Sequence, residues 1–570
     1  MKITTLTALI LCGCIIVRSQ EPRRYDVLIH EIMANPSGSP ALPNIKYIEL
    51  YNASANAFDL KEWSINDGTN TATIRINLIL EPDSFVVLCS NSGAPTLAQY
   101  GKTIGVTGFL PLRVNGDVIS LRSADGALIH AVEYNRSWYE NDVKARGGWS
   151  LEMVDAHYPC SSNTNWKASI NDMGGTPGKS NSVNAVNKDE TAPQPLYAYA
   201  ADSLHTTIVF DEPIDSLSAS VTTNYTISDG INTPLVVFAE PPLFNHVTIT
   251  LASALLRNKT YSVTIKNISD CSGNIMDQQV LKTGLADVAL KNDIVINEIL
   301  FNPPDDGAEY VELYNRSNHA VNCKDLIITT RNTSGNLGTL QQLSEKDLFI
   351  FPGECRLLTE DVAAVQKTFI CKNADAFTEI SSMPTLPNSS GTIVILNFRG
   401  DVIDELSYSD QWQFPLISNN KGVALERIDF SAPTQDKNNW HSAAASVGYG
   451  TPTYQNSQFL TGQQLAGEIN ISPQVFSPDN DGYDDFLTVH YHFPEPGFVC
   501  NITIYDAAGR PVRYLVRNGL CGTDGDFRWD GLDEKNQKLT IGIYVIVTEV
   551  YNLQGKTNKF KQAVTLARRL

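Results

Sequence analysis

Hydrophobic positions along this chain form short alternating runs and not helical stripes. Residues 27–29, 47–50, 85–88 and 118–121 are rich in β-branched, leucine and aromatic side chains, and Gly, Pro, Asn or Asp lie between such runs. Alternation of this length between turn-forming residues is typical of strands in a β-sandwich. No stretch has the periodicity of a long amphipathic helix. We therefore predict an all-β chain, and its 570 residues suffice for about four domains.

One set of sequence motifs occurs twice along the chain. EIMANP at 31–36 is followed by YIELYN at 47–52, and EILFNP at 298–303 is followed by YVELYN at 310–315. Three further pairs follow in the same order: GWSLE at 148–152 with GVALE at 422–426, NW at 165–166 with NW at 439–440, and GTP at 175–177 with GTP at 450–452. Motifs that recur in one order indicate duplication. We predict that the copies superpose, with Glu31 on Glu298 and a buried Trp166 on a buried Trp440.

These motifs, together with GDVISL at 116–121, resemble the lamin tail domain. That family has an immunoglobulin-like β-sandwich fold and occurs in nuclear lamins and in many exported bacterial proteins. The resemblance implies a fold and an interaction role, because the family has no shared catalytic residues. With it, the predicted fold class becomes tandem immunoglobulin-like β-sandwich modules.

Two further modules have their own motifs. FDEPI at 210–214, YTI at 225–227, YSVTI at 261–265 and DCSGN at 270–274 resemble a bacterial Ig-like module, a family of spacers. FSPDNDGYDD at 476–485, ITIYDAAGRPV at 502–512, WDG at 529–531 and GIYVI at 542–546 resemble two families at once. One is the Ig-like domain of flagellar hook-capping proteins, and the other is the sorting domain that directs type IX secretion in gliding bacteria.

The predicted organisation is a series of four modules behind a signal peptide. The predicted boundaries are 1–19 for the signal peptide, 20–187 for the first lamin-tail-like copy, 188–288 for the Ig-like module, 289–460 for the second copy and 461–570 for the C-terminal module.

The N-terminus reads as an export signal. Lys2 precedes an apolar run at 3–17, and Ser19 suits the position before a signal-peptidase cut. The alternative is a lipoprotein box at 11–14, which would make Cys14 a lipid-bearing N-terminus. No later stretch reaches 18 apolar residues, so we expect no transmembrane segment in the mature chain. We predict an extracytoplasmic protein, secreted or at the outer cell surface.

The net charge and the spacing of the cysteines argue against several classes of function. The net charge of −19, without a Lys/Arg cluster, argues against nucleic-acid binding and favours divalent cations. Eight cysteines follow the signal, and none forms a CxxC pair, so a zinc ribbon or a redox motif has no support. The pair that we predict to form a disulfide is Cys500 and Cys521, which lie in one small module.

Catalytic motifs are missing from the sequence. It contains no GxSxG, no HExxH and no phosphate-binding GxxxxGK[ST]. Glu31 and Glu298 could form carboxylate pairs with Glu49 and Glu312, but glutamates kept in both copies more simply cap backbone groups or pair with a local cation. His490 and His492 share a strand face, which suits either a metal pair or two ordinary strand histidines. We assign no catalytic residue and predict that the chain is not an enzyme.

One motif favours a metal. Asp479, Asp481 and Asp485 place carboxylates around Gly482, and a backbone carbonyl near Tyr483 would add a ligand. Hard oxygen donors at alternate positions suit calcium, although the twelve-residue EF-hand pattern is incomplete. The alternative is an Asx-rich turn leading into the next strand.

The predicted function is a non-catalytic binding or structural scaffold at the bacterial cell envelope, with a protein or cell-surface polymer as its ligand. Two alternatives stay open: a component of secretion or gliding motility, and a secreted hydrolase whose site no motif reveals.

Overall fold

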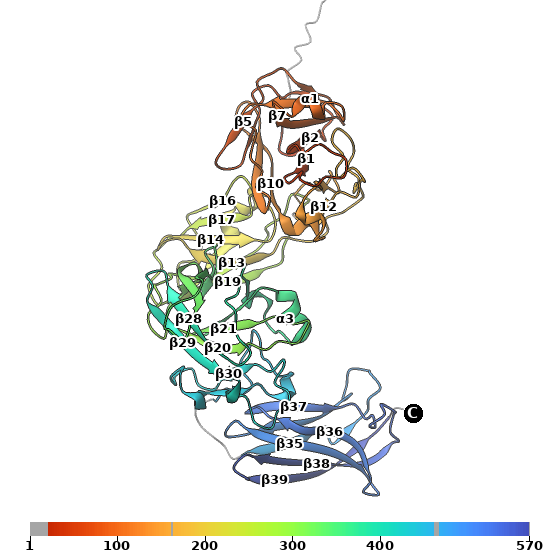
Figure 1. Cartoon of the computed structure of the whole chain (residues 1–570), viewed down its shortest axis with the longest axis vertical. Coiled ribbons are helices and arrows are strands. Elements are labelled where there is room, and N and C mark those ends of the chain that lie inside the picture. Colours follow the sequence, from red (N-terminus) through yellow and green to blue (C-terminus); the bar gives the residue numbers. More distant parts are fainter. Residues whose placement is uncertain (1–20, 161–162, 461–466, 569–570) are drawn as a thin grey trace, which may run out of the picture. The chain divides into compact units, whose positions relative to one another are not determined.

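The computed structural model describes residues 21–160, 163–460 and 467–568. Strands dominate throughout, and the helices are short: α1 (Ala94–Leu97), α2 (Ser216–Ala219) and α3 (Val362–Thr368) (Figure 1). The predicted all-β class is confirmed. The signal peptide, with Ser19 and the alternative Cys14, lies outside the described residues. No helix in the described ranges combines the length and the apolar character needed to cross a bilayer.

The first copy is a sandwich of two main sheets, accompanied by a third sheet of two short strands. Its strands are β1 (Val27–Met33), β2 (Tyr47–Asn52), β3 (Phe58–Asp59), β4 (Ser64–Asn66), β5 (Thr71–Thr73), β6 (Ile79–Leu80), β7 (Phe85–Ser90), β8 (Thr103–Val106), β9 (Gly116–Arg122), β10 (Leu128–Asn135), β11 (Leu151–Met153) and β12 (Trp166–Ala168). The six-stranded sheet has the order β12-β11-β1-β2-β7-β8, and the four-stranded sheet has the order β10-β9-β4-β5. Apolar side chains from both sheets form one core, which includes Trp166.

The second copy repeats this topology. Its strands are β20 (Ile294–Leu300), β21 (Tyr310–Asn315), β22 (Val321–Asn322), β23 (Leu326–Thr330), β24 (Gln341–Gln342), β25 (Phe349–Ile350), β26 (Cys355–Thr359), β27 (Phe377–Glu379), β28 (Ser390–Asn397), β29 (Val402–Ser409), β30 (Leu425–Arg427) and β31 (Trp440–Ser442). The sheet orders β31-β30-β20-β21-β26-β27 and β29-β28-β23-β24 match those of the first copy strand by strand. Trp166 and Trp440 are each 3% exposed, so both tryptophans are core residues as predicted.

A bulge recurs at the same place in both copies. The register of β1 against β2 shifts between Ile29 and Glu31, and that of β20 against β21 shifts between Ile296 and Glu298. A bulge inserts one residue into a strand and re-aims the side chains beside it. The two glutamates therefore hold the same position in equivalent sheets, which is the superposition that the sequence repeat predicts.

The other two modules are smaller sandwiches. The Ig-like module contains β13 (Pro195–Ala200), β14 (His205–Phe210), β15 (Tyr225–Ile227), β16 (Val236–Ala239), β17 (His246–Thr250), β18 (Thr260–Ile265) and β19 (Gln279–Gly284), in sheets β13-β14-β17-β16 and β15-β18-β19. The C-terminal module contains β32 (Glu468–Ser472), β33 (Val475–Phe476), β34 (Leu487–His492), β35 (Phe498–Asp506), β36 (Pro511–Leu520), β37 (Asp524–Trp529), β38 (Gly542–Asn552) and β39 (Thr557–Leu566), in sheets β32-β34-β37 and β33-β39-β38-β35-β36.

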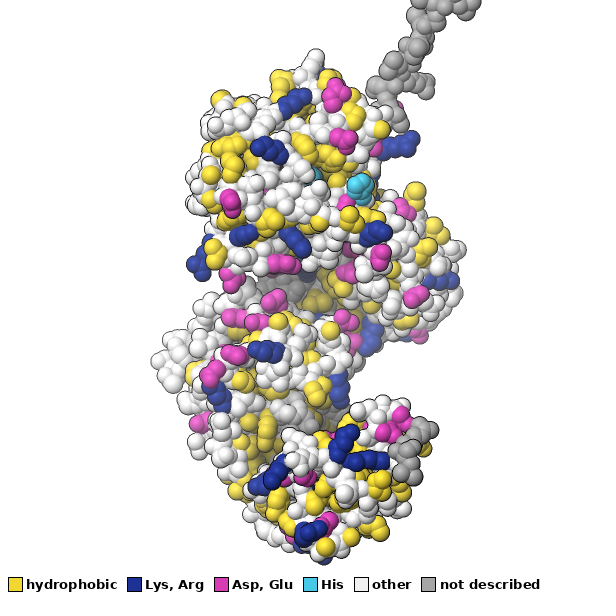
Figure 2. Space-filling model, turned by 90° about the vertical axis from the view of Figure 1, so that its right-hand side faces the viewer, with side chains coloured by type: hydrophobic (Ala, Val, Ile, Leu, Met, Phe, Trp, Pro, Cys, Tyr) yellow, Lys and Arg dark blue, Asp and Glu magenta, His cyan; other side chains and the backbone are white. Residues whose placement is uncertain are grey.

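Contacts between residues divide the chain into two compact units. The first comprises residues up to 197, 205–252 and 263–281, and the second comprises 198–204, 253–262 and 282–570. On the face drawn in Figure 2, charged side chains of both signs are scattered among neutral ones. That face shows no basic patch among the described residues.

Candidate functional site

Three glutamates meet in the large sheet of each copy. In the first copy Glu31 on β1 lies opposite Glu49 on β2 and opposite Glu152 on β11, and all three are 0% exposed. The second copy has the same arrangement, equally buried, with Glu298 opposite Glu312 and Glu426.

The GTP segment of the first copy supplies hydrogen-bond donors to these carboxyl groups. The backbone N–H of Thr176 donates to Glu31 Oε1 at 2.8 Å, and that of Gly178 donates to Glu49 Oε2 at 2.5 Å. Thr176 Oγ1 donates to Glu152 Oε1 at 3.0 Å. The segment is thereby held against interior strands of the sheet by side chains that those strands carry.

The second copy repeats these contacts atom for atom. The backbone N–H of Thr451 donates to Glu298 Oε1 at 2.9 Å, and that of Thr453 donates to Glu312 Oε2 at 2.6 Å. Thr451 Oγ1 lies 2.7 Å from Glu426 Oε1. Of the two structural roles expected for the recurrent glutamates, the structure shows the capping of backbone groups.

Burial also sets the protonation of these glutamates. Desolvation and the neighbouring carboxyl groups raise the pKa of Glu31 and of Glu298 well above the usual value, and burial raises the pKa of Glu312 to about 7. Perturbed carboxyl groups are candidates for acid–base catalysis. Here, however, the side chains are closed off from solvent, and a substrate has no access to them. We therefore regard the clusters as structural clamps.

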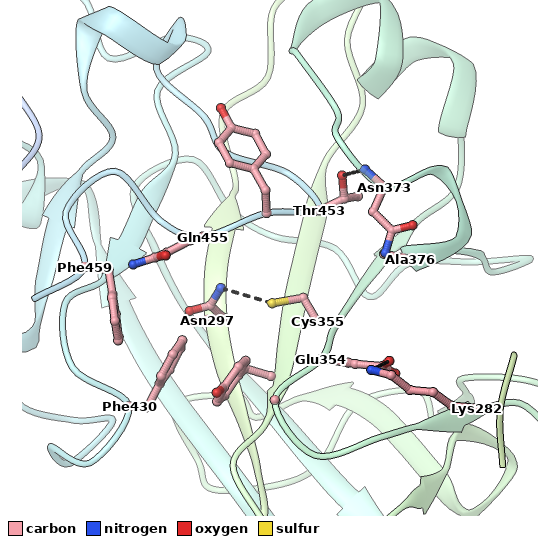
Figure 3. A pocket seen from close by; sticks show the side chains of 13 residues that line it. Lys282, Asn297, Glu354, Cys355, Asn373, Ala376, Phe430, Thr453, Gln455 and Phe459 are labelled. Atoms are coloured by element: carbon pink, nitrogen blue, oxygen red, sulfur yellow. Dashed lines mark hydrogen bonds and ion pairs between the residues drawn. The ribbon is translucent and has the colours of Figure 1, made fainter. Parts of the chain in front are cut away.

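A pocket of about 510 Å³ is lined by residues of the second copy and by Lys282 of β19 (Figure 3). Phe430 stacks on Tyr314 with ring centroids 3.6 Å apart, and the centroid of Phe459 lies 4.8 Å from that of Phe430. Across the pocket, Lys282 and Glu354 form an ion pair at 2.6 Å. The other lining residues are Asn297, Gly353, Cys355, Asn373, Ala376, Thr453, Tyr454 and Gln455.

The pocket lies where two large side chains of the first copy are replaced by small ones. His30 and Phe85 of the first copy have ring centroids 5.4 Å apart, and Phe85 also stacks on Tyr51 at 4.9 Å. Strand register places Asn297 at the position of His30 and Cys355 at the position of Phe85. In Figure 3 these two smaller side chains point toward each other between the aromatic wall and the ion pair, with Asn297 Nδ2 3.9 Å from Cys355 Sγ.

The aromatic wall is also specific to the second copy. At the positions of Phe430 and Phe459 the first copy has Ala156 and Asn184. A search for catalytic motifs misses this pocket. Side-by-side comparison of the two copies would have found it, because each exchange is visible once the repeats are aligned.

The predicted calcium residues lie together in the loop before β34. One carboxylate oxygen each of Asp479, Asp481 and Asp485 lies within 4.8 Å of the others. The loop also forms the alternative turn: Asp485 accepts from the Asn480 N–H at 2.6 Å, and Asp481 accepts from the Tyr483 N–H at 2.9 Å. The Tyr483 side chain is exposed.

The cysteines pair differently from the prediction. The disulfide joins Cys160 to Cys271, with Cα atoms 6.2 Å apart. The predicted Cys500–Cys521 bridge is not formed in this structure, where both are free, buried thiols, and a hydrogen bond with Cys500 together with burial raises the pKa of Cys521. We predicted Cys500–Cys521 because these residues are close in sequence. Cys160 and Cys271 are distant in sequence and come together only because two modules pack against each other.

The histidine pair in the C-terminal module faces carboxylates across β34 and β37. His490 Nδ1 lies 2.8 Å from Asp526 Oδ1, and His492 Nδ1 lies 3.3 Å from Asp524 Oδ2. Each histidine is thus paired with a carboxylate of the neighbouring strand, and both interpretations of the pair stay predictions.

Comparison with known families identifies two of the four modules. The model of the Lamin Tail Domain matches residues 20–136, and that of a bacterial Ig-like domain matches residues 182–283. The chain thus contains a lamin tail domain followed by a bacterial Ig-like domain. Among curated proteins, none matches this sequence.

Solved structures resemble the chain only weakly. The N-terminal part of the bacterial S-layer protein SbsC is 18% identical, with a TM-score of 0.16, and the match covers 31% of this chain and 42% of that one. A DUF4876 family protein from Bacteroides thetaiotaomicron is 10% identical, with a TM-score of 0.19, and the match covers 42% and 96%. PorZ, a surface component of the type IX secretion system of Porphyromonas gingivalis, is 10% identical, with a TM-score of 0.15, and the match covers 80% and 56%. Likenesses this weak do not identify a function.

Proposed function

We propose that this protein is an exported, non-catalytic scaffold of the bacterial envelope whose second copy binds a surface polymer through the pocket beside Phe430. The observation that carries the proposal is the difference between the copies. The same sandwich is plugged by His30 and Phe85 in the first copy, whereas the second copy is open and lined by aromatic rings.

The lining favours a saccharide unit. Ligand pockets combine apolar and aromatic walls with a few polar groups that fix orientation. The rings of Phe430 and Phe459 offer flat apolar surface for the C–H face of a sugar, and the exposed Gln455 and the Lys282–Glu354 pair offer donors and acceptors for hydroxyl groups. The pocket volume of about 510 Å³ suits one or two such units.

The test is to close the pocket with the residues of the first copy. We expect the double variant Asn297→His, Cys355→Phe to lose at least tenfold in affinity for the best binder in a panel of envelope oligosaccharides, measured by calorimetry on the full chain. The matched control is Phe85→Leu in the first copy, which should leave affinity unchanged. Unchanged binding by a folded double variant would reject the pocket, and binding to peptides alone would reject the saccharide.

Three further assignments belong to this proposal. The second copy is a second lamin tail domain, supported by its matching topology and its matching glutamate cluster. The chain reaches the cell exterior through the signal at 1–19, and the N-terminal residue of the mature protein distinguishes cleavage after Ser19 from a lipidated Cys14. The C-terminal module is of the hook-capping or sorting type, and deletion of 461–570 should abolish surface display only in the sorting case.

The loop at 479–485 is proposed to bind calcium. Three carboxylates within 4.8 Å repel one another, and a cation removes that repulsion. Calcium should therefore raise the melting temperature of the C-terminal module, chelator should reverse the shift, and Asp481→Ala should abolish it. Melting that is indifferent to calcium at about 1 mM would leave only the turn.

A further inference from the structure

A second group of carboxylates converges within the first compact unit. Asp189 precedes β13, Glu212 follows β14, and Asp270 lies in the turn after β18. One carboxylate oxygen of each lies within 4.8 Å of the other two. Three separate segments of chain therefore bring negative charge to one point.

Two of the three carboxylates are held in place by a shared set of donors. Asp270 Oδ1 accepts from the backbone N–H of Gly273 at 2.7 Å and of Asn274 at 2.9 Å. Asn274 Nδ2 also donates to Asp270 Oδ2 at 2.8 Å and to the backbone carbonyl of Asp189 at 3.1 Å. Asp189 Oδ2 accepts from Ser272 Oγ at 3.1 Å. The arrangement is fixed before any ligand arrives.

Glu212 is the member without a partner. It is only 9% exposed, and it makes no side-chain hydrogen bond or ion pair with any described residue. Burial and the charges of Asp189, Asp211 and Asp270 raise the pKa of Glu212 to about 8. A buried carboxylate is ordinarily paired or bound to a metal.

We propose that Asp189, Glu212 and Asp270 bind one calcium ion. The donors are all oxygen atoms, whereas zinc prefers nitrogen and sulfur donors. Calcium accepts several carboxylates in irregular geometry, whereas magnesium requires an octahedron. The ion ties the segment that carries Asp189 to two loops of the Ig-like module, next to the disulfide at Cys271. This site is independent of the pocket and of the loop at 479–485.

Glu212→Gln is the suitable variant because Glu212 makes no hydrogen bond that folding would lose. The glutamine keeps the shape and removes the charge, so the variant should fold in chelator at least as well as the unmodified chain. The matched control is Glu190→Gln, which removes the same charge from an exposed neighbour.

The experiment is hydrogen exchange of the full chain by mass spectrometry, in chelator and in calcium at about 1 mM, the range of extracellular calcium modules. We expect calcium to slow exchange at least threefold in peptides covering 188–194, 211–215 and 268–275. That protection should persist in Glu190→Gln and disappear in Glu212→Gln, while any protection at 476–487 is the same in all three proteins.

Two results would overturn the proposal. One is exchange at these peptides that does not respond to calcium in the unmodified chain. The other is equal protection in Glu212→Gln. Equal protection by magnesium at the same concentration would overturn the choice of calcium.

Discussion

At the scale of single residues, the two copies use different side chains to accept a hydrogen bond from the same buried backbone N–H. The bulge leaves a backbone N–H pointing at the opposite sheet, and it must be satisfied because it is buried. In the first copy Ile29 N–H donates to His130 Nδ1 at 2.9 Å, and in the second copy Ile296 N–H donates to Asp404 Oδ2 at 2.8 Å. A neutral imidazole accepts without a countercharge, whereas the buried aspartate lies 3.4 Å from Arg427.

Acid should therefore destabilise the first copy through His130. Burial lowers the pKa of His130 to about 4, below the unfolded value of about 6.5. The unfolded chain binds more protons in this range, so stability is full above pH 6.5 and is lost as the pH falls toward 4. From pH 6.5 to 5 the loss is roughly 2 kcal/mol. Calorimetry of the first unit across this range measures it.

The control separates His130 from other histidines. His130→Gln keeps an acceptor for Ile29 and does not titrate, so it should remove about half of the acid dependence. His30, whose pKa burial also lowers to about 4, accounts for what remains. His157→Gln changes an exposed imidazole of the same copy and should leave the dependence as it was. An unaltered acid dependence in His130→Gln would contradict the argument.

At the scale of elements, the GTP segment depends on hydroxyl and backbone donors that reach into a sheet. Thr451 Oγ1 lies 2.7 Å from Glu426 Oε1 and 3.1 Å from Glu298 Oε2, so one hydroxyl serves two buried carboxyl groups. The segment continues into Ser457, whose carbonyl accepts from the Thr523 N–H at 2.9 Å. Loosening of the segment should therefore also weaken its hydrogen bond to the C-terminal module.

Thr451→Val should destabilise the second unit by about 2 kcal/mol, because it leaves buried carboxyl oxygens without a donor. Thr451→Ser keeps the hydroxyl and should cost less than half as much. Hydrogen exchange at residues 450–458 provides the local measurement, with faster exchange expected only in the valine variant. Equal effects of both variants would assign the role to the methyl group and its packing.

Elements were predictable where the physics is local. Alternating apolar residues specify strands, and the repeat revealed equivalent positions, such as Glu31 and Glu298 beside the shared bulge. The pocket depends instead on pairs of side chains that fill or vacate one space. Such compensation is decided by packing across strands, so the sequence repeat had to be compared position by position to show it.

At the scale of the whole molecule, contacts between segments that are distant in the chain are even harder to predict from the sequence. The carboxylates at 189, 212 and 270 come from three separate segments of the Ig-like module, and the sulfurs of Cys160 and Cys271 meet only after the first copy and the Ig-like module pack. The sequence predicted each module and its order but contained no signal for these meeting points. The disulfide and the proposed ion both act where the first copy joins the Ig-like module, within one compact unit.

The Cys160–Cys271 bridge should be a principal source of stability for that unit. Its partners are 111 residues apart, and closing a loop of about 100 residues stabilises the folded state by roughly 4–5 kcal/mol in the chain-entropy account. Such a bridge persists in oxidising compartments, which agrees with the proposed export. Cys160→Ser should therefore lower the first calorimetric transition by several degrees, and reductant should do the same to the unmodified chain. Cys500→Ser removes a thiol that is free in the structure, and it should leave the temperature of the first transition unchanged. Peptide mapping of the exported protein without reduction should recover the two segments as one linked species, and alkylation of both Cys160 and Cys271 under those conditions would contradict the bridge.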